Sequence, residues 1–240
     1  MIDGITITKQ LGQGEELNFS GLKHIPSAGR GSLDRFLLKD IINEDPTLSF
    51  MYKRPQIEYN SNNGIVTFNG SIPYLLHNNN FEGMSLEEGR VAIHNLCNTT
   101  GLDFFSGDVK LFEYGIIVET PLPYGEYNRH HIRLENMDRI PYKAKNRYTG
   151  LEFRNNVKKV KIYDAGQNVK KLSKKIRTSL IDRGMYNPMN NYLKVEMRYE
   201  NPLKCFDVAS LKVYDLLDEL FIGRCQDDLI TTYSNIKKIG

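Results

Sequence analysis

Residues 192–200 alternate between apolar and polar side chains without a break. The apolar positions are Leu193, Val195, Met197 and Tyr199, and the polar positions are Lys194, Glu196, Arg198 and Glu200. A period of two is typical of a β-strand, in which successive side chains point to opposite faces of the sheet. The chain must therefore build a sheet with one apolar face, and that face needs a covering layer.

Further strands are predicted along the chain, several of them as hairpins. The segments are residues 2–8, 56–60, 64–69, 109–119, 148–154 and 157–163. The turns Ser61-Asn62-Asn63-Gly64 and Asn155-Asn156 each separate two of these segments, and Asn and Gly accept the positive φ that tight turns require. Residues 109–119 are rich in β-branched and aromatic side chains, which predicts a mostly buried strand.

One helix has clear signals at both ends. Ser85 and Glu88 have the spacing of a capping box, and Gly101 is placed to end the helix. Its predicted apolar face consists of Ile93, Leu96 and Cys97.

Two more helices and a loop complete the expected fold. Residues 168–183 predict a basic helix that ends at Gly184, and Asp207 is predicted to cap a helix running through Leu216, Leu217 and Leu220. The Pro/Gly-rich residues 121–125 predict a loop. Hairpins with intervening helices indicate an α+β fold, an antiparallel β-sheet with flanking helices. We expect one domain over residues 1–240, with 121–147 as the region where a sub-boundary would fall.

Composition and missing motifs exclude several classes of protein. No run approaches the roughly 18 apolar residues of a membrane span, and the first residues lack a secretory pattern. The three cysteines are widely spaced with no CxxC pair, which predicts a reduced, cytoplasmic protein without a disulfide framework. The sequence has no phosphate-binding loop, GxGxxG, GxSxG or HExxH motif.

The net charge of +3 hides an uneven distribution. Residues 143–200 hold 15 Lys and Arg against 5 Asp and Glu, whereas the rest of the chain holds 17 against 24. A segment with a balance of +10 is typical of proteins that bind a polyanion, most often nucleic acid. A solvated helix face rich in lysine is the alternative interpretation.

Three strand residues are candidates for chemistry. Tyr163 and Lys161 lie on the strand face opposite Val160 and Ile162, Glu196 lies on the polar face of its strand, and Glu113 interrupts an apolar run. If these strands are neighbours, Glu113 and Glu196 can share a divalent metal beside the Tyr163 hydroxyl. Carboxylate oxygens suit Mg²⁺ or Mn²⁺, and a nucleophilic tyrosine conserves the energy of a cleaved phosphodiester as phosphotyrosine. The alternative is a cross-strand ion pair beside an ordinary strand tyrosine.

The third metal ligand stays open at this point, with Glu58, His77 and His131 as candidates. His130 and His131 are adjacent, so on a strand they point to opposite faces and do not chelate one metal together.

Five segments occur in an order that resembles a known family. They are Ser71-Ile72-Pro73 to Asn78-Asn79-Asn80, Ala92-Ile93-His94-Asn95-Leu96, Leu111-Phe112-Glu113-Tyr114-Gly115, Val160-Lys161-Ile162-Tyr163-Asp164 and Leu193-Lys194-Val195-Glu196-Met197. Together they resemble the rolling-circle replication initiators of small single-stranded DNA phages and plasmids, in particular the filamentous-phage-type replication protein family with members from Bacteroidetes hosts. The resemblance covers most of residues 60–220.

This resemblance implies a fold related to the HUH endonucleases and a set of site residues. Tyr163 would be the nicking nucleophile, with Glu113 and Glu196 as carboxylates of a Mg²⁺ or Mn²⁺ site. The implied partners are single-stranded or hairpin origin DNA and the host polymerase and helicase. The family usually has Tyr-Asp-Lys-Gly where this chain has Tyr163-Asp164-Ala165-Gly166. The missing lysine would stabilise the developing phosphate charge, so either Lys159, Lys161 or Lys170 replaces it or activity is reduced.

Basic residues around Tyr163 are the predicted DNA contacts. They are Lys159, Lys161, Lys170, Lys171, Lys174, Lys175 and Arg198. On a single helix, 170/174 and 171/175 would form a stripe that holds a DNA backbone without reading its bases. Four nearby aromatic residues either stack on unpaired bases or belong to the core, namely Tyr148, Phe153, Tyr186 and Tyr192.

The sequence thus predicts a metal-dependent enzyme that nicks and rejoins DNA to initiate rolling-circle replication, through a covalent 5′-phosphotyrosine. The rival hypothesis is a DNA-binding protein that kept the fold and lost the chemistry. A third is a structural or partner-binding protein, which would show no salt-sensitive DNA affinity. The origin sequence, the metal and the oligomeric state are left open.

Overall fold

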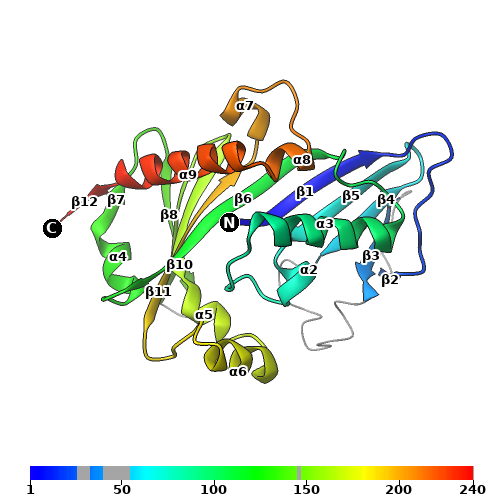
Figure 1. The fold of residues 1–240 in the computed structure, drawn as a ribbon. Helices are drawn as coiled ribbons and strands as arrows, with labels where there is room; N and C mark the ends of the chain where they lie inside the picture. Colours follow the sequence, from blue (N-terminus) through cyan, green and yellow to red (C-terminus); the bar gives the residue numbers. More distant parts are fainter. Residues whose placement is uncertain (26–32, 40–54, 145–146, 240) are drawn as a thin grey trace.

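A ten-stranded antiparallel sheet forms the centre of the molecule (Figure 1). The computed structural model describes residues 1–25, 33–39, 55–144 and 147–239. From one edge of the sheet to the other the strands are β2 (Leu22–Ile25), β3 (Leu33–Leu38), β4 (Gln56–Asn60), β5 (Ile65–Ser71), β1 (Ile2–Gln10), β6 (Asp108–Thr120), β11 (Asn191–Tyr199), β10 (Lys158–Asp164), β9 (Arg147–Arg154) and β8 (Asp138–Ala144). At the centre of the sheet, β6 from the middle of the chain therefore lies between β1 from its first third and β11 from its last third.

Helices flank this sheet, and a short second sheet pairs β7 (His131–Arg133) with β12 (Lys237–Lys238). The helices are α2 (Tyr74–His77), α3 (Leu86–Thr100), α4 (Tyr124–His130), α5 (Ala165–Val169), α6 (Lys174–Asp182), α7 (Pro202–Phe206), α8 (Val213–Leu216) and α9 (Glu219–Ser234). The predicted α+β class, an antiparallel sheet with flanking helices, is confirmed.

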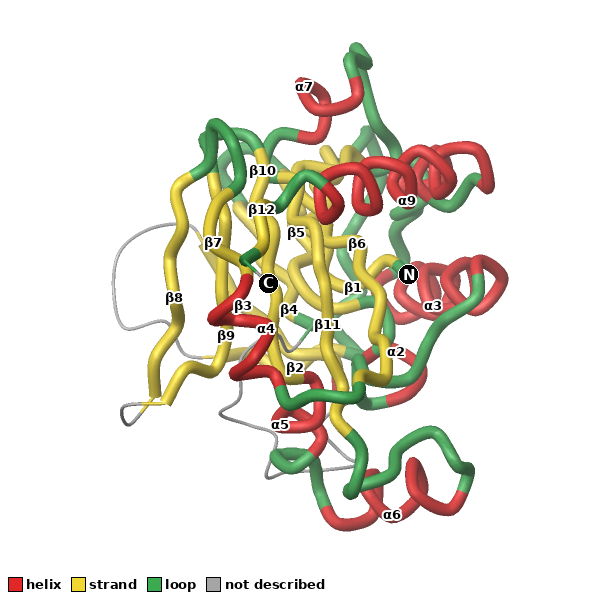
Figure 2. The backbone as a smooth tube through the Cα atoms, turned by 90° about the vertical axis from the view of Figure 1, so that its left-hand side faces the viewer, coloured by secondary structure: helices red, strands yellow, loops and turns green. Residues whose placement is uncertain are grey.

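The two long helices, α3 and α9, lie on the same side of the sheet (Figure 2). Ile93 of α3 and Phe221 of α9 join Ile5 and Phe112 of the sheet in one apolar core. Burial of such side chains removes about 25 cal/mol of unfavourable hydration per Å² of apolar surface, which makes this layer the main source of stability. The other face of the central strands carries the polar residues of the alternating pattern.

The local signals in the sequence placed several elements correctly. The hairpins β4–β5 and β9–β10 form as predicted, and Gly64 in the first turn has a φ of +64°. In α3 the Ser85 side chain accepts a hydrogen bond from the Glu88 N–H, and the Glu88 side chain accepts one from the Ser85 N–H. Gly101 ends this helix with a φ of +74°.

The prediction of one basic helix over residues 168–183 is wrong. The structure has two short helices, α5 and α6, because two side chains start separate helices. Asp164 accepts a hydrogen bond from the Gln167 N–H, and Ser173 accepts one from the Ile176 N–H. Lys170 and Lys171 consequently lie between the helices, so the expected stripe along one helix face does not form.

Three smaller expectations are also corrected. Asp207 has a φ of +52° and ends α7, and the predicted helix is split into α8 and α9. The residue that caps α9 is Asp218, whose carboxylate accepts hydrogen bonds from two backbone N–H groups. The predicted loop at 121–125 gives way to α4 at Tyr124. The strand at 109–119 is buried at Val109 and over residues 112–115, whereas Ile116 and Val118 are 40% and 38% exposed.

Candidate functional site

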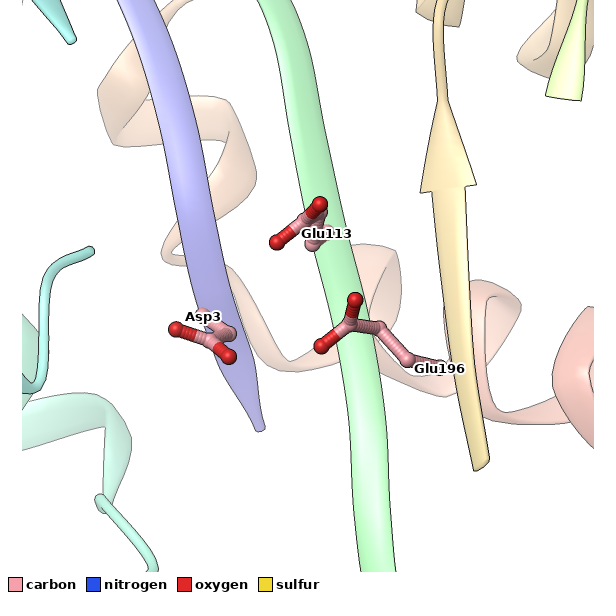
Figure 3. Close-up of side chains that lie close together, drawn as sticks. All are labelled: Asp3, Glu113 and Glu196. Carbon is pink, nitrogen blue, oxygen red and sulfur yellow. The ribbon is translucent and has the colours of Figure 1, made fainter. Parts of the chain in front are cut away.

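Three buried carboxylates from adjacent strands converge on the polar face of the sheet (Figure 3). Asp3 comes from β1, Glu113 from β6 and Glu196 from β11, and one oxygen of each lies within 4.8 Å of the others. All three residues have an exposed fraction of 0%. We call this group the carboxylate cluster.

Strand register and two glycines bring the cluster together. Glu196 pairs with Gly115 across β11 and β6, and a register shift in β1 lies between Ile2 and Ile5, next to Asp3. A Cβ on Gly4 would lie 2.5 Å from Glu113 Oε2, and a Cβ on Gly115 would lie 3.2 Å from the Cα of Glu196. A side chain at Gly4 would crowd the Glu113 carboxylate, and one at Gly115 would crowd the neighbouring β11 backbone, whose Val195 carbonyl oxygen would lie 2.9 Å away.

Three cations of the same chain neutralise the cluster. Lys161 Nζ lies 2.6 Å from Glu113 Oε1 and 3.1 Å from Glu196 Oε1. Lys194 Nζ lies 2.5 Å from Asp3 Oδ2 and 3.2 Å from Glu196 Oε2. Arg198 Nη1 lies 3.0 Å from Glu113 Oε1. Buried carboxylates require such partners, since an unpaired ion in a protein interior is unstable.

Lys194 is the most deeply buried of these cations, with an exposed fraction of 1%. Burial by itself lowers the pKa of a lysine, but the attraction of Asp3 and Glu196 outweighs it and raises the pKa of Lys194 above its ordinary value. The ammonium group is thus charged and joins two of the three carboxylates.

Tyr163 lies at the edge of the cluster. It faces Lys194 across the β10–β11 pairing, and its hydroxyl donates a hydrogen bond to Glu196 Oε2 over 3.2 Å. Lys194 Nζ contacts the same oxygen. The structure therefore brings together Tyr163, Glu113 and Glu196, the three residues that the sequence singled out.

Sequence reasoning missed Asp3, the third carboxylate. The three residues considered for that place lie elsewhere: Glu58 pairs with Arg35 over 2.9 Å, His77 lies within 4.0 Å of Glu82, and His131 lies 3.1 Å from the Tyr233 hydroxyl. Asp3, like Glu113, is an acidic residue within a predicted strand, and this is the sequence signal that could have pointed to it. The signal does not place Asp3 in the site, because nothing in the sequence shows that β1 lies next to β6.

Asp3 also has two neutral partners. Its Oδ1 accepts a hydrogen bond from the Ser71 hydroxyl over 2.6 Å, and its Oδ2 accepts one from the Asn80 side chain over 2.9 Å. The segment from Ser71 to Asn80, one of the five that carry the family resemblance, therefore contacts the cluster through its first and its last residue.

The predicted DNA contacts divide into two groups. On the sheet, Lys161 and Arg198 pair with the cluster, and Lys159 lies 2.8 Å from Glu200 Oε1. Hydrogen bonding from Lys159, and next from Arg198, lowers the pKa of Glu200. The second group is exposed and consists of Lys170, Lys171, Lys174 and Lys175. Within the part of the chain that the structure describes, no carboxylate lies at ion-pair distance from these four lysines.

Three of the four aromatic candidates for base stacking belong to the apolar cores. Phe153, Tyr186 and Tyr192 are buried. The side chain of Tyr148 lies outside the described part of the structure.

The donor set of the cluster fits a hard divalent cation. Three carboxylate oxygens within 4.8 Å are the ligands that Mg²⁺ and Mn²⁺ prefer. The formal charge of the cluster is already balanced by its three cations, however, so a dication would have to displace at least one of them. Lys161 is the better placed of the two lysines, since its side chain is 16% exposed against 2% for Lys194.

Comparisons with known proteins find a likeness among solved structures. Neither a protein-family model nor a curated protein matches the sequence. Among solved structures, a rolling circle replication initiator protein from Geobacillus stearothermophilus aligns over 94% of this chain and 83% of its own, with 11% sequence identity and a TM-score of 0.46. A likeness at this level does not extend to individual residues or to an activity.

Among the described residues, no helix has the length and apolar character to cross a membrane.

Proposed function

We propose that this protein nicks and rejoins DNA at a specific site, and so initiates rolling-circle replication through a covalent 5′-phosphotyrosine on Tyr163. The proposal rests on one observation above all. The Tyr163 hydroxyl donates a hydrogen bond to a buried carboxylate, Glu196, within a group of three carboxylates on the polar face of the sheet. The sequence resemblance to rolling-circle initiators suggests the substrate.

The residues supply a nucleophile and a proton acceptor. The Tyr163 oxygen attacks the phosphorus, the bond from phosphorus to the 3′ oxygen breaks, and the 5′ phosphate stays on the tyrosine. Glu196 Oε2 is 3.2 Å away and takes the phenolic proton, while the departing 3′ oxygen takes a proton from solvent. The freed 3′ hydroxyl then primes synthesis, and the reverse reaction rejoins the strand.

A metal ion has a defined place in this proposal. Asp3, Glu113 and Glu196 would hold a Mg²⁺ or Mn²⁺ ion, which when bound supplies positive charge to a phosphate oxygen. Lys161 would leave the cluster at that point, and its ammonium group would be free to contact the phosphate beside Tyr163. In this role Lys161 would supply the positive charge that the resembling family has as a lysine at the position of Ala165.

Exposed lysines supply the DNA-binding charge. Lys174 and Lys175 form the first turn of α6, where the helix dipole disfavours cations. The dipole and the two ammonium groups together produce a positive potential suited to phosphate groups. Lys170 and Lys171 extend this surface toward α5, which begins two residues after Tyr163 in the chain.

The test is a covalent-adduct gel with a labelled origin oligonucleotide, with Mg²⁺ or Mn²⁺ present. The parent protein gives a protein–DNA band that resists denaturation, and Tyr163→Phe gives none. Tyr142→Phe is the matched control, because Tyr142 lies on nearby β8 and hydrogen-bonds to Glu152 instead of Glu196. A Tyr163→Phe variant that nicks as fast as the parent contradicts the proposal.

A second candidate function is DNA binding without chemistry. Two observations favour it: Ala165 stands where the resembling family has lysine, and the cluster is already neutralised by its own cations. This function predicts DNA affinity that falls with salt but no covalent adduct under any metal condition. The same gel therefore separates the two candidates.

A further inference from the structure

Three consecutive residues connect the carboxylate cluster to the basic helix α6. The Asn80 side chain donates a hydrogen bond to Asp3 Oδ2 over 2.9 Å. The ring of Phe81 packs edge-on against Tyr186 and Tyr192, with centroids 5.5 and 5.2 Å apart. Glu82 accepts two hydrogen bonds from Arg183, at 2.6 and 2.8 Å. We call residues 78–82 the strap.

The strap is fixed by its own hydrogen bonds. Asn78 ends α2 with a φ of +54°, so the chain turns sharply there. Asn79 Oδ1 accepts hydrogen bonds from the N–H groups of Phe81 and Glu82, at 3.0 and 2.9 Å. Asn79 and Glu82 are both buried. A segment held in this way keeps a fixed distance between Asp3, which it contacts at one end, and Arg183, which it contacts at the other.

What the strap holds at its far end is a small separate core. Five buried residues of α5, α6 and their surroundings make up that core: Ala165, Val169, Leu180, Tyr186 and Tyr192. Phe81 of the strap packs against it, as does Ile117 of β6. Figure 1 shows α5 and α6 lying to one side of the sheet, away from α3 and α9. Because this core is small, contacts outside it, such as the Glu82–Arg183 pair, help to fix the orientation of α6 relative to the strap.

We propose that the strap is a positioning element that sets which phosphodiester of a bound strand reaches Tyr163. The lysines at the start of α6 hold the DNA backbone, and the strap fixes their distance from the carboxylate cluster. Glu82 and Arg183 are the positioning residues, since they lock α6 to the strap without touching the reacting atoms. This inference rests on the proposed nicking function.

The test compares conservative variants of the ion pair with matched controls. Glu82→Gln and Arg183→Gln each remove the pair. Glu87→Gln removes an exposed carboxylate from α3, and Arg133→Gln removes the same charge as Arg183→Gln from an exposed position on β7, outside the strap and the basic helix. Hydrogen exchange of the 174–182 amides reports the orientation of α6, and an end-labelled oligonucleotide reports the cut position.

Glu82→Gln and Arg183→Gln are expected to raise amide exchange in 174–182 by at least about tenfold, the equivalent of one lost charge-assisted hydrogen bond. They also spread cleavage from one phosphodiester to its neighbours. The two controls keep the parent's single cut position. The charge-swapped double variant Glu82→Arg/Arg183→Glu restores it, which a general loss of stability would not.

The outcomes separate this inference from the proposed function. A parent protein that forms no adduct overturns the nicking function, and the positioning role falls with it. A parent that cuts at one phosphodiester, together with Glu82→Gln and Arg183→Gln variants that cut only there, overturns the positioning role alone. Exchange in α6 that is no faster than in the controls overturns it as well.

Discussion

Two charged regions of this protein differ in the burial and pairing of their lysines. In the carboxylate cluster, Lys161 and Lys194 are largely or wholly buried, and each bonds to two carboxylates. In the basic lobe, which we define as residues 165–186, Lys174 and Lys175 are exposed. Among the described residues, no acid pairs with either of them. The first arrangement positions side chains, whereas the second leaves charge available to a partner.

This difference changes how the charge distribution should be interpreted. Residues 143–200 carry a balance of +10, but Lys161, Lys194 and Arg198 belong to that segment. They pair with Asp3 and Glu113, which belong to the acidic rest of the chain. Charge counted along the sequence therefore overstates the positive charge presented by the sheet. The excess that can attract a polyanion lies mainly in the basic lobe.

Removing the buried lysine should have the largest effect. Lys194→Met leaves Asp3 and Glu196 without their shared cation, so the free energy of unfolding should fall by about 3–5 kcal/mol. Lys175→Met, in the basic lobe, should change it by less than about 0.5 kcal/mol. Urea denaturation followed by circular dichroism measures both.

A double variant checks the cause of that loss. Lys194→Met/Asp3→Asn removes the lysine together with one of the two charges it neutralises, so it should be more stable than Lys194→Met alone. Equal stability of the two variants would mean that lost packing around the lysine stem, and not an unpaired carboxylate, explains the effect.

The close approach at Gly4 should be the next most sensitive feature. A Cβ there would lie 2.5 Å from Glu113 Oε2, so Gly4→Ala must displace the carboxylate or the β1 backbone, at about 1–3 kcal/mol of stability. Gly223→Ala is the control: no atom lies within 4 Å of the added Cβ, and alanine favours helix α9 by about 0.5–1 kcal/mol. A melting temperature that falls in Gly4→Ala and rises in Gly223→Ala would support this view, and an unchanged melting temperature in Gly4→Ala would contradict it.

Much of the sheet could be predicted because its signals are local. The period of two placed Lys161 and Tyr163 on one face of β10 and Glu196 on the polar face of β11, and turn residues marked two hairpins. Strand neighbours that are distant in sequence are not encoded locally. The pairing of β1 with β6, which brings Asp3 to Glu113, could only be seen in the structure.

The basic lobe was predicted less well for a different reason. Its charge pattern fits a single helix over 168–183, but the capping side chains Asp164 and Ser173 decide where helices start. Helix-cap preferences of Ser and Asp compete with helix periodicity, and here the caps prevail. The roles of Tyr163, Glu113, Glu196 and the lysines stay predictions that the experiments must test.

The exposed lysines should determine how DNA affinity depends on salt. Lys174→Ala/Lys175→Ala should make the slope of log affinity against log salt less steep by about 1.4, since each phosphate contact on a single strand contributes about 0.7. Lys110→Ala/Lys204→Ala, which removes two exposed lysines outside the basic lobe, should leave the slope unchanged. Fluorescence anisotropy at several salt concentrations measures it. Equal slopes for both double variants would place DNA binding outside the lobe.

The smallest effect should be the pH dependence of the link between the two regions. The hydrogen bonds from Arg183 lower the pKa of Glu82 below its ordinary value, so the folded protein binds a proton there less readily than the unfolded chain. Its contribution to stability is therefore full above the unfolded pKa of about 4.3 and disappears as pH falls through the folded pKa. Glu82→Gln should be less stable than the parent at pH 6, and the gap should close toward pH 3. Arg183→Gln should show the same convergence in urea denaturation, because it removes the same pair. A gap that stays constant with pH would mean that the ion pair does not hold the basic lobe to the strap.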